Sequence, residues 1–389
     1  SNSTVVVADC IVDNSENTGL EILGLNNVGG CAGYMNTSTI RNFTNTVAIT
    51  SEGSNIGGVV GFSTYRTNII SDCSNKVAIT GIKNVGGILG YSGAATISGC
   101  SNTAAITGKF NIGGIMGTGE NGSDRIAHSY NNGTITSDSD TEGEVFVGGI
   151  AGRYVGKIDT CTNFGMVRAY YERETPAVKK CGAGGIAGAT GLVAYNTAHT
   201  ATITGCTSIG DIIADGMFMV GGIVGYGECV TISKCKVDNS SETGRPELVI
   251  RGKGYVGGCL GYGVADAYGY CPCNITDFTN TVEITSSTSY GTGGVAGLIT
   301  GSLINCRNEV PIASTAEAAP SGATCYGTGG IAGVVYKSSN GTSNVTGCVN
   351  TSSVLAPKSQ NVGGIVGSAG SSNSTVVVAD CIVDNSENT

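Results

Sequence analysis

The stretch NVGGILGYSGAATISGCSNTAAITG, residues 84–108, contains three signatures that recur along the whole chain. The first is Gly-Gly-x-x-Gly with two apolar residues at the x positions. The second is a Thr-Ile-Ser-Gly-Cys segment, and the third is an Asn two residues after the Cys, followed by a short run such as Ala-Ile-Thr. β-Branched runs are typical of strands, whereas Gly and Asn are typical of turns. The stretch therefore predicts a short unit of strands and turns.

The Gly-Gly-x-x-Gly motif occurs eleven times, at spacings of 27 to 37 residues that leave no room for a separate globular domain. The copies begin at Gly29, Gly57, Gly86, Gly113, Gly148, Gly184, Gly221, Gly257, Gly293, Gly329 and Gly363. A unit of this size cannot bury its own apolar side chains, so each copy must stack on the next. The sequence therefore predicts an all-β fold, a single parallel β-solenoid over residues 1–389 with about eleven three-strand coils. Coils about 4.8 Å apart would give a rod of roughly 53 Å.

Stacking in register places equivalent residues of successive coils in columns. The residue that ends the Thr-Ile-Ser-Gly-Cys-like segment is expected to form a buried core column of Phe43, Cys73, Cys100, Tyr130, Cys161, Cys206, Cys235, Phe278, Cys306, Cys348 and Cys381. The Asn two residues later is expected to form a ladder of side-chain amides, as stacked Asn does in cross-β assemblies. Its members are Asn45, Asn75, Asn102, Asn132, Asn163, Asn280, Asn308 and Asn350. Of the two apolar x residues, one is expected to face the core and the other to form an apolar ladder outside, because neighbours on a strand point to opposite faces.

Composition narrows the function classes. The chain has 64 Gly among 389 residues and only 13% charged residues, so neither long helices nor ordinary disorder is expected. It has 29 acidic and 20 basic residues and no basic cluster, which makes nucleic acid an unsuitable partner. No stretch approaches the roughly 18 apolar residues of a membrane span. We also expect no cofactor and no metal site, because the Cys are not set in CxxC pairs.

The motif residues resemble those of a known family. Val-Gly-Gly-Ile-Leu-Gly-Tyr, followed by Ile-Ser-Gly-Cys-Ser-Asn and Ala-Ile-Thr in residues 84–108, is similar to the GLUG-motif repeats of bacterial cell-surface proteins. The resemblance extends over essentially the whole chain. It implies an extracellular or cell-surface location and a repeat architecture, and it brings no catalytic residues. The coils of 34 to 37 residues are longer than the period near 28 of the short form, so their insertions are specific to this protein.

The same 18 residues, SNSTVVVADCIVDNSENT, form residues 1–18 and residues 372–389. If residue 19 followed the second copy, the next Gly-Gly motif would start 37 residues after Gly363, within the normal spacing. We therefore expect one unit of 371 residues plus an 18-residue overlap into the next. A solenoid end is an exposed strand edge, and neither end of this sequence shows a capping segment. End-to-end pairing with copies of the same chain is the expected partnership, and lateral neighbours are a second expected partner.

The predicted function is a structural unit of an extracellular bacterial fibre or surface stalk, and not an enzyme. The only histidines, His128 and His199, lie on predicted loops of different coils, and no acid–base cluster is evident. Two alternatives remain open. One is an adhesin that binds glycans or matrix through its loop tips, and the other, less favoured, is a carbohydrate-active β-helix enzyme.

Three further cysteines are expected to be neighbours in space. Cys229 lies six residues before its column position, while Cys271 and Cys273 lie seven and five before theirs in the next coil. The sequence therefore predicts a disulfide from Cys229 to Cys271 or Cys273, which would fit an oxidising extracellular setting.

Overall fold

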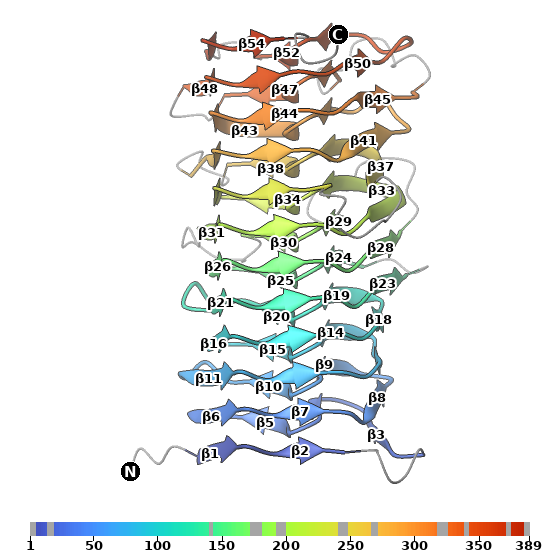
Figure 1. Cartoon of the computed structure of the whole chain (residues 1–389), viewed down its shortest axis with the longest axis vertical. Coiled ribbons are helices and arrows are strands. Elements are labelled where there is room, and N and C mark those ends of the chain that lie inside the picture. Colours follow the sequence, from blue (N-terminus) through green and yellow to red (C-terminus); the bar gives the residue numbers. More distant parts are fainter. Residues whose placement is uncertain are drawn as a thin grey trace.

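The computed structural model shows a stack of β-strand coils with the two termini at opposite ends of the long axis (Figure 1). It describes residues 5–13, 19–139, 143–171, 181–191, 200–239, 248–265, 271–316, 326–337, 342–370 and 375–384. Within these ranges every regular element is a strand. The described residues contain no helix long and apolar enough to cross a membrane.

The strands form four rows along the stack, which we name rows A to D. Row A contains β1 (Val5–Ala8), β6 (Ser38–Arg41), β11 (Asn68–Ser71), β16 (Ala95–Ser98), β21 (Arg125–Ala127), β26 (Lys157–Asp159), β31 (Ala201–Thr204), β35 (Val230–Ser233), β39 (Cys273–Thr276), β48 (Ser343–Thr346) and β53 (Val376–Ala379). Row B is a twelve-stranded sheet of β2 (Ile11–Val12), β7 (Thr44–Asn45), β12 (Ser74–Asn75), β17 (Ser101–Asn102), β22 (Tyr130–Asn131), β27 (Thr162–Asn163), β32 (Thr207–Ser208), β36 (Lys236–Val237), β40 (Thr279–Asn280), β44 (Arg307–Asn308), β49 (Val349–Asn350) and β54 (Ile382–Val383).

Row C is a twenty-stranded sheet, with two short strands in most coils. It contains β3 (Glu21–Gly24), β4 (Val28–Gly29), β8 (Ala48–Ser51), β9 (Ser54–Gly57), β13 (Ile79–Thr80), β14 (Lys83–Gly86), β18 (Ile106–Gly108), β19 (Phe110–Gly113), β23 (Ile135–Asp138), β24 (Val145–Gly148), β28 (Val167–Tyr170), β29 (Cys181–Gly184), β33 (Ile212–Gly221), β37 (Val249–Gly257), β41 (Glu283–Ser286), β42 (Thr292–Gly293), β45 (Ile312–Ser314), β46 (Thr328–Gly329), β50 (Val354–Leu355) and β51 (Val362–Gly363).

Row D contains β5 (Ala32–Met35), β10 (Val60–Ser63), β15 (Leu89–Ser92), β20 (Met116–Gly119), β25 (Ala151–Tyr154), β30 (Ala187–Thr190), β34 (Val224–Glu228), β38 (Leu260–Val264), β43 (Ala296–Ile304), β47 (Ala332–Tyr336) and β52 (Val366–Ala369). β43 is long enough to pair in both row D and row A, which joins these two rows in one sheet.

Neighbouring coils pair in parallel and in register. In row C, Ile79 pairs with Ile49 on one side and with Ile106 on the other, and in row B Asn75 pairs with Asn45 and Asn102. The pairs between named strands are parallel throughout. Among the described residues, each named strand outside the first and last coils pairs on both sides, so the unpaired strand edges lie at the two ends. The predicted parallel β-solenoid is confirmed. The predicted three strands per coil are not: most described coils contain five short strands in four rows, because the chain turns at more corners than the strand pattern indicates.

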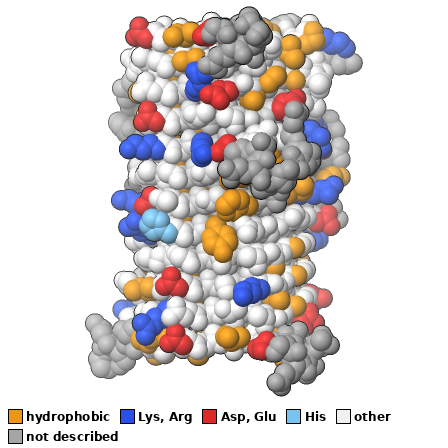
Figure 2. All heavy atoms as spheres, in the orientation of Figure 1, with side chains coloured by type: hydrophobic (Ala, Val, Ile, Leu, Met, Phe, Trp, Pro, Cys, Tyr) orange, Lys and Arg blue, Asp and Glu red, His pale blue; other side chains and the backbone are white. Residues whose placement is uncertain are grey.

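The interior is filled by columns of aliphatic side chains. In row A the inward column runs through Ile40, Ile70, Ile97, Ile126, Ile158, Ile203, Ile232 and Ile275, all with 2% or less of their surface exposed. Fully burying one such side chain stabilises the fold by about 1.5–3 kcal/mol. Charged side chains are scattered on the outside, between many uncharged polar ones (Figure 2). The stack therefore derives its stability from repeated columns.

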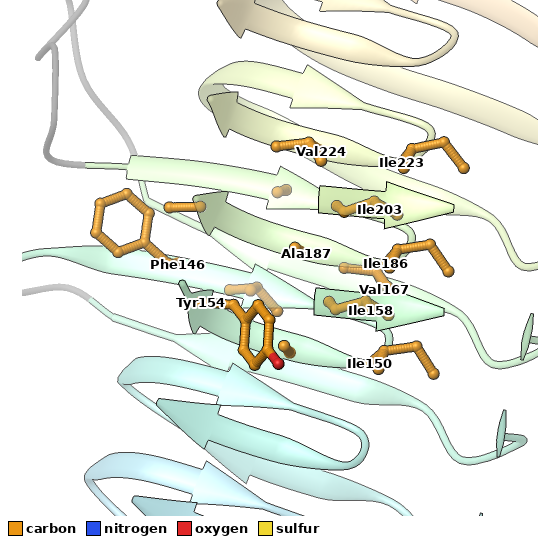
Figure 3. Packing of buried hydrophobic residues seen from close by; sticks show 14 of the residues in the cluster. Phe146, Ile150, Tyr154, Ile158, Val167, Ile186, Ala187, Ile203, Ile223 and Val224 are labelled. Atoms are coloured by element: carbon orange, nitrogen blue, oxygen red, sulfur yellow. The ribbon is translucent and has the colours of Figure 1, made fainter. Parts of the chain in front are cut away.

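The Gly-Gly motif forms a corner between row C and row D. The chain leaves β14 at Gly86, turns through Gly87 and Ile88, and enters β15 at Leu89. Ile88 and Leu89 are both completely buried, so the predicted outer apolar ladder is wrong. Alternation fails because the two residues lie on different sides of a corner and not on one straight strand. Figure 3 shows the equivalent corner residues Ile150, Ile186 and Ile223 as an interior column.

Candidate functional site

The asparagine column of row B forms two runs of a hydrogen-bonded ladder inside the stack, separated by Ser208 and Val237. Asn45 Nδ2 donates to Asn75 Oδ1 at 3.0 Å, and Asn75 Nδ2 donates to Asn102 Oδ1 at 2.8 Å. The ladder continues from Asn102 to Asn131 and from Asn131 to Asn163 at 2.8 and 2.9 Å. A second run, from Asn280 through Asn308 to Asn350, has two contacts of 2.9 Å. Each amide thus stabilises the pairing of two coils away from water.

The same amides also hold the turn that follows them. Asn102 Nδ2 donates a second hydrogen bond to Ala104 O at 2.8 Å, and Asn131 Nδ2 does the same to Gly133 O at 2.8 Å. Both Asn side chains are completely buried. One carboxamide therefore donates hydrogen bonds both to a neighbouring coil and to its own turn. An aliphatic side chain of similar size could form neither.

The ladder explains why the second glycine of the motif is needed. A Cβ on Gly87 would lie 2.1 Å from Gly114 O and 2.7 Å from Asn102 Cγ. A Cβ on Gly114 would lie 2.4 Å from Asn131 Cγ. The corner backbone thus packs directly on the amide ladder. The Gly-Gly motif and the ladder Asn, about 15 residues later in the sequence, are therefore the two sides of one packing contact.

The structure corrects two predicted column members in one coil. Asn102 pairs with Asn131 and Ser101 with Tyr130, so the ladder residue is Asn131 and not Asn132. Asn132 and Tyr130 are exposed, and Ser129 takes the core position predicted for Tyr130. The Ser129 hydroxyl accepts from Cys100 N at 3.1 Å and donates to Ala127 O at 2.9 Å. The prediction was wrong for two reasons. Asn131 and Asn132 are adjacent, so either could be the ladder residue, and Tyr130 is an apolar residue at the spacing expected for the core column.

The remaining core-column residues lie where the sequence placed them. Phe43, Cys73, Cys100, Cys161, Cys206, Cys235, Phe278, Cys306 and Cys348 are buried, and Cys381 is half-buried. Adjacent thiols are linked through the main chain: Cys73 N donates to Cys100 Sγ, and Cys206 N to Cys235 Sγ, both at 3.4 Å. The hydrogen bond with Cys73, together with burial, raises the pKa of Cys100 well above its usual value. This column is packing and not a reactive site.

The structure brings the three cysteines of the predicted disulfide together but does not bridge them. The Cys229 thiol donates to Cys271 O at 3.2 Å, and the Cys273 thiol points inward, to Val264 O at 3.3 Å. Burial raises the pKa of Cys273 to about 12. The predicted bridge is not formed: the thiols of Cys229 and Cys273 both contact main-chain oxygens.

A second asparagine ladder escaped the sequence analysis. Asn55 Nδ2 donates to Asn27 Oδ1 and Asn84 Nδ2 to Asn55 Oδ1, both at 2.8 Å, and Asn111 Nδ2 donates to Asn84 Oδ1 at 3.1 Å. All four residues have φ between 54° and 66°, a left-handed conformation that Asn tolerates. The signal was an Asn two residues before the first glycine of four successive motifs.

His128 occupies another left-handed corner, with φ of 49°, where other coils have Asp72, Gly99 or Asn305. It is exposed and serves as a turn residue. His199 lies outside the described residues. Among the residues that the structure describes, no group of three or more His, Cys, Asp or Glu could hold a metal ion.

The end coils show the repeated segment in two settings. At one end, β1 pairs with β6, with Val5 opposite Ser38 and Ala8 opposite Arg41. At the other end β53, which has the same sequence, pairs with β48, with Val376 opposite Ser343 and Ala379 opposite Thr346. Val7 therefore lies on Ile40, while its equivalent Val378 lies on Val345. One strand sequence thus has a matching partner for each of its two edges.

The chain matches no protein-family model, and no curated protein is significantly similar to it in sequence.

Proposed function

We propose that the chain is a structural repeat unit of an extracellular bacterial fibre or surface stalk, in which units follow one another along one continuous solenoid. The observation that carries the proposal is the double pairing of one strand sequence. Since Val5–Ala8 fits β6 and Val376–Ala379 fits β48, a single copy fits between β48 of one unit and β6 of the next. A stack built on the 371-residue period then has no interruption in row A.

Row B supports the same continuation. Ile11 pairs with Thr44 at one end, and its equivalent Ile382 pairs with Val349 at the other. Thr44 N donates to Cys10 O at 3.2 Å, and Ile382 N donates to Cys348 O at 2.9 Å. The 18-residue segment therefore offers hydrogen-bonding groups on both edges in both rows.

Rows C and D would meet directly across such a junction. The inward column of row C ends at Val354, which pairs with Ile312, and begins at Ile22, which pairs with Ile49. In a continued stack Ile22 of the next unit would lie on Val354. An aliphatic residue then follows an aliphatic residue, as it does elsewhere in this column.

The end coils also expose apolar surface that the inner coils bury. Val378 and Val383 are 46% and 61% exposed at one end, although their partners Val345 and Asn350 in the next coil are buried. At the other end Val7 and Ile22 are half-buried, although their partners Ile40 and Ile49 are buried. Exposed apolar side chains beside unpaired strand edges favour further strand pairing. The proposed mechanical role rests on this joint, in which parallel main-chain ladders would run unbroken from unit to unit.

The direct test is a tandem chain in which residues 1–371 precede residues 1–389. We expect one straight rod by negative-stain electron microscopy, longer than the single chain by about 53 Å, the length of eleven coils. A matched control joins residues 1–371 to residues 19–389, which removes one copy of the segment at the junction. Two rods joined by a kink in the first chain, as in the control, would refute the proposed continuity.

A further inference from the structure

A cluster of aromatic and charged side chains lies on the outside of the stack where row D turns into row A. It involves the turns that follow β10, β15 and β20, which belong to successive coils (Figure 1). We infer that this cluster is a binding site for a neutral oligosaccharide. We name it the Tyr65 site, and its members are Tyr65, Tyr91, Glu120, Glu144 and Arg153. The inference adds a binding function and does not depend on the proposed fibre.

The ring of Tyr65 is a fixed platform that faces solvent. The residue is 65% exposed, and a Cβ on Gly93 would lie 2.9 Å from Tyr65 Cγ, so the ring begins directly over the glycine backbone. At its far end the Tyr65 hydroxyl forms a hydrogen bond of 3.0 Å with the Tyr91 hydroxyl. The electron-rich face of an aromatic ring attracts C–H groups. A sugar ring with equatorial hydroxyls presents a flat face of C–H groups that suits this platform.

Hydrogen bonds lead from the platform to carboxylates. Tyr91 Oη donates to Glu120 Oε2 at 2.7 Å, and Arg153 Nη1 lies 3.5 Å from Glu120 Oε1 and 3.6 Å from Glu144 Oε2. Burial, and then the hydrogen bonds with Tyr65 and Glu120, raise the pKa of Tyr91 above its usual value, so its hydroxyl keeps its proton. The side chains of Glu120 and Glu144 remain 33% and 45% exposed. These oriented oxygens can accept hydrogen bonds from sugar hydroxyls beside the ring.

The charges at the site favour a neutral ligand. Two carboxylates and one guanidinium leave a formal charge of −1. The guanidinium of Arg153 already lies against both carboxylates, and its side chain is only 17% exposed. A phosphate or an acidic sugar would therefore meet net repulsion. An exposed ring beside a few convergent acceptors is suited to a neutral polyhydroxylated ligand.

Buried polar side chains hold the turns of the site in place. Asn68 Nδ2 donates to Arg66 O at 2.7 Å within the turn that carries the ring. Asp124 accepts from Ser92 Oγ at 2.6 Å and from Asn121 N at 3.2 Å, which fixes the next two turns relative to each other. Asn68 and Asp124 are at most 1% exposed. Because the turns are already ordered, binding a ligand there costs little conformational entropy.

The aromatic surface continues beyond the site along the stack. The rings of Tyr91 and Phe62 are parallel within 1°, with centroids 5.2 Å apart, and those of Phe62 and Tyr34 are parallel within 10°, with centroids 5.7 Å apart. Tyr34 is 59% exposed and Phe62 is half-buried. This strip of ring edges runs parallel to the long axis. An oligosaccharide that places one sugar on Tyr65 can therefore cover further apolar surface with its next units, which a single sugar cannot.

Isothermal titration calorimetry of the 389-residue chain tests the inference. The probes are cellohexaose, xylohexaose and N-acetylchitohexaose, with hexagalacturonate as the acidic comparison. We expect at least one neutral probe to bind, and hexagalacturonate to bind about tenfold more weakly or not at all. Tyr65→Ala and Glu120→Gln should each weaken binding of the neutral probe by about tenfold. Tyr130→Ala is the matched control, since Tyr130 is a 41% exposed tyrosine of row B, and it should leave the affinity unchanged.

Nitration of tyrosines in the unmodified sequence gives a readout that does not depend on how the variants fold. Mass spectrometry should show that the bound probe protects Tyr65 and leaves Tyr130 reactive. If no neutral probe binds, the inferred function is wrong. If a probe binds but neither protects Tyr65 nor responds to Tyr65→Ala, the sugar lies elsewhere and the assignment of the site is wrong. Tighter binding of hexagalacturonate would overturn the choice of a neutral ligand.

Discussion

Asn102 lies directly below Asn131 in the stack, and its Nδ2 donates to Asn131 Oδ1 at 2.8 Å with both side chains completely buried. The contact is one link of a chain that also includes Asn75 Nδ2, which donates to Asn102 Oδ1. Removing the central amide therefore leaves polar groups without partners in two neighbouring coils and in the Ala104 turn.

Asn102→Ala should destabilise the protein by about 2–3 kcal/mol, because each buried donor or acceptor left unsatisfied costs about 1–3 kcal/mol. The measurement is equilibrium unfolding in urea, followed by circular dichroism. Asn132→Ala is the matched control, since Asn132 is an exposed Asn one position from the ladder. Its effect should stay within about 0.5 kcal/mol. Equal losses in the two variants would contradict the assignment of the ladder to Asn131.

Ser208 interrupts the ladder after Asn163, and its Oγ is buried with no hydrogen-bond partner. Ser208→Asn should stabilise the protein by about 1 kcal/mol, because the new amide would accept from Asn163 and donate to its own turn as the other ladder residues do. The backbone setting favours the substitution: a Cβ on Gly185 would meet the Ser208 side chain as one on Gly149 would meet Asn163. A lower urea midpoint for this variant would show that Val237, which pairs with Ser208 in the next coil, leaves no room for the amide.

The repeat period together with the short β-branched runs was sufficient to predict parallel stacking, because small units of strands must stack on one another to bury their apolar side chains. Ten of the eleven core-column residues and seven of the eight ladder residues followed from it. The exact register near Tyr130 could not be predicted from the period, since Asn131 and Asn132 both fit the pattern. The pairing with Ser101 and Asn102 decides between them. The inward direction of Ile88 also escaped, because it depends on a backbone corner that alternation rules do not describe.

The glycines at the corners are of two kinds: some, such as Gly205, have a left-handed conformation, and others, such as Gly87, leave no space for a Cβ. Gly205 has φ of 62°, and a Cβ there would lie 3.6 Å from Thr160 Oγ1, an ordinary contact. Gly205→Asn should therefore change stability by less than about 0.5 kcal/mol, because Asn tolerates this conformation and Asn305 adopts it in the same column. Gly87→Ala should instead cost more than about 3 kcal/mol, since its Cβ would lie 2.1 Å from Gly114 O. Thermal unfolding of the two variants measures the difference, and similar melting temperatures would show that the corner can move.

Asp124 makes the stability of the folded chain depend on pH, and the direction of the dependence follows from its raised pKa. Its carboxylate is almost completely buried and accepts from Ser92 Oγ at 2.6 Å and from Ala95 N at 2.7 Å. Burial outweighs these hydrogen bonds and raises the pKa of Asp124 from 3.8 to about 6. The folded chain therefore binds this proton more tightly than the unfolded chain does. Its contribution to stability is fully present below about pH 4 and is lost as the pH rises through 6.

The loss should amount to about 3 kcal/mol between pH 4 and pH 7, at about 1.36 kcal/mol for each unit by which the pKa is raised. Other carboxylates also titrate in this range, so the comparison uses Asp124→Asn, which keeps an acceptor for Ser92 and Ala95 and carries no charge. We expect urea unfolding to show the variant gaining stability relative to the parent as the pH rises from 4 to 7. A difference between the two proteins that does not change with pH would mean that the pKa of Asp124 is the same in the folded and unfolded chains, with its charge stabilised by the turn it holds.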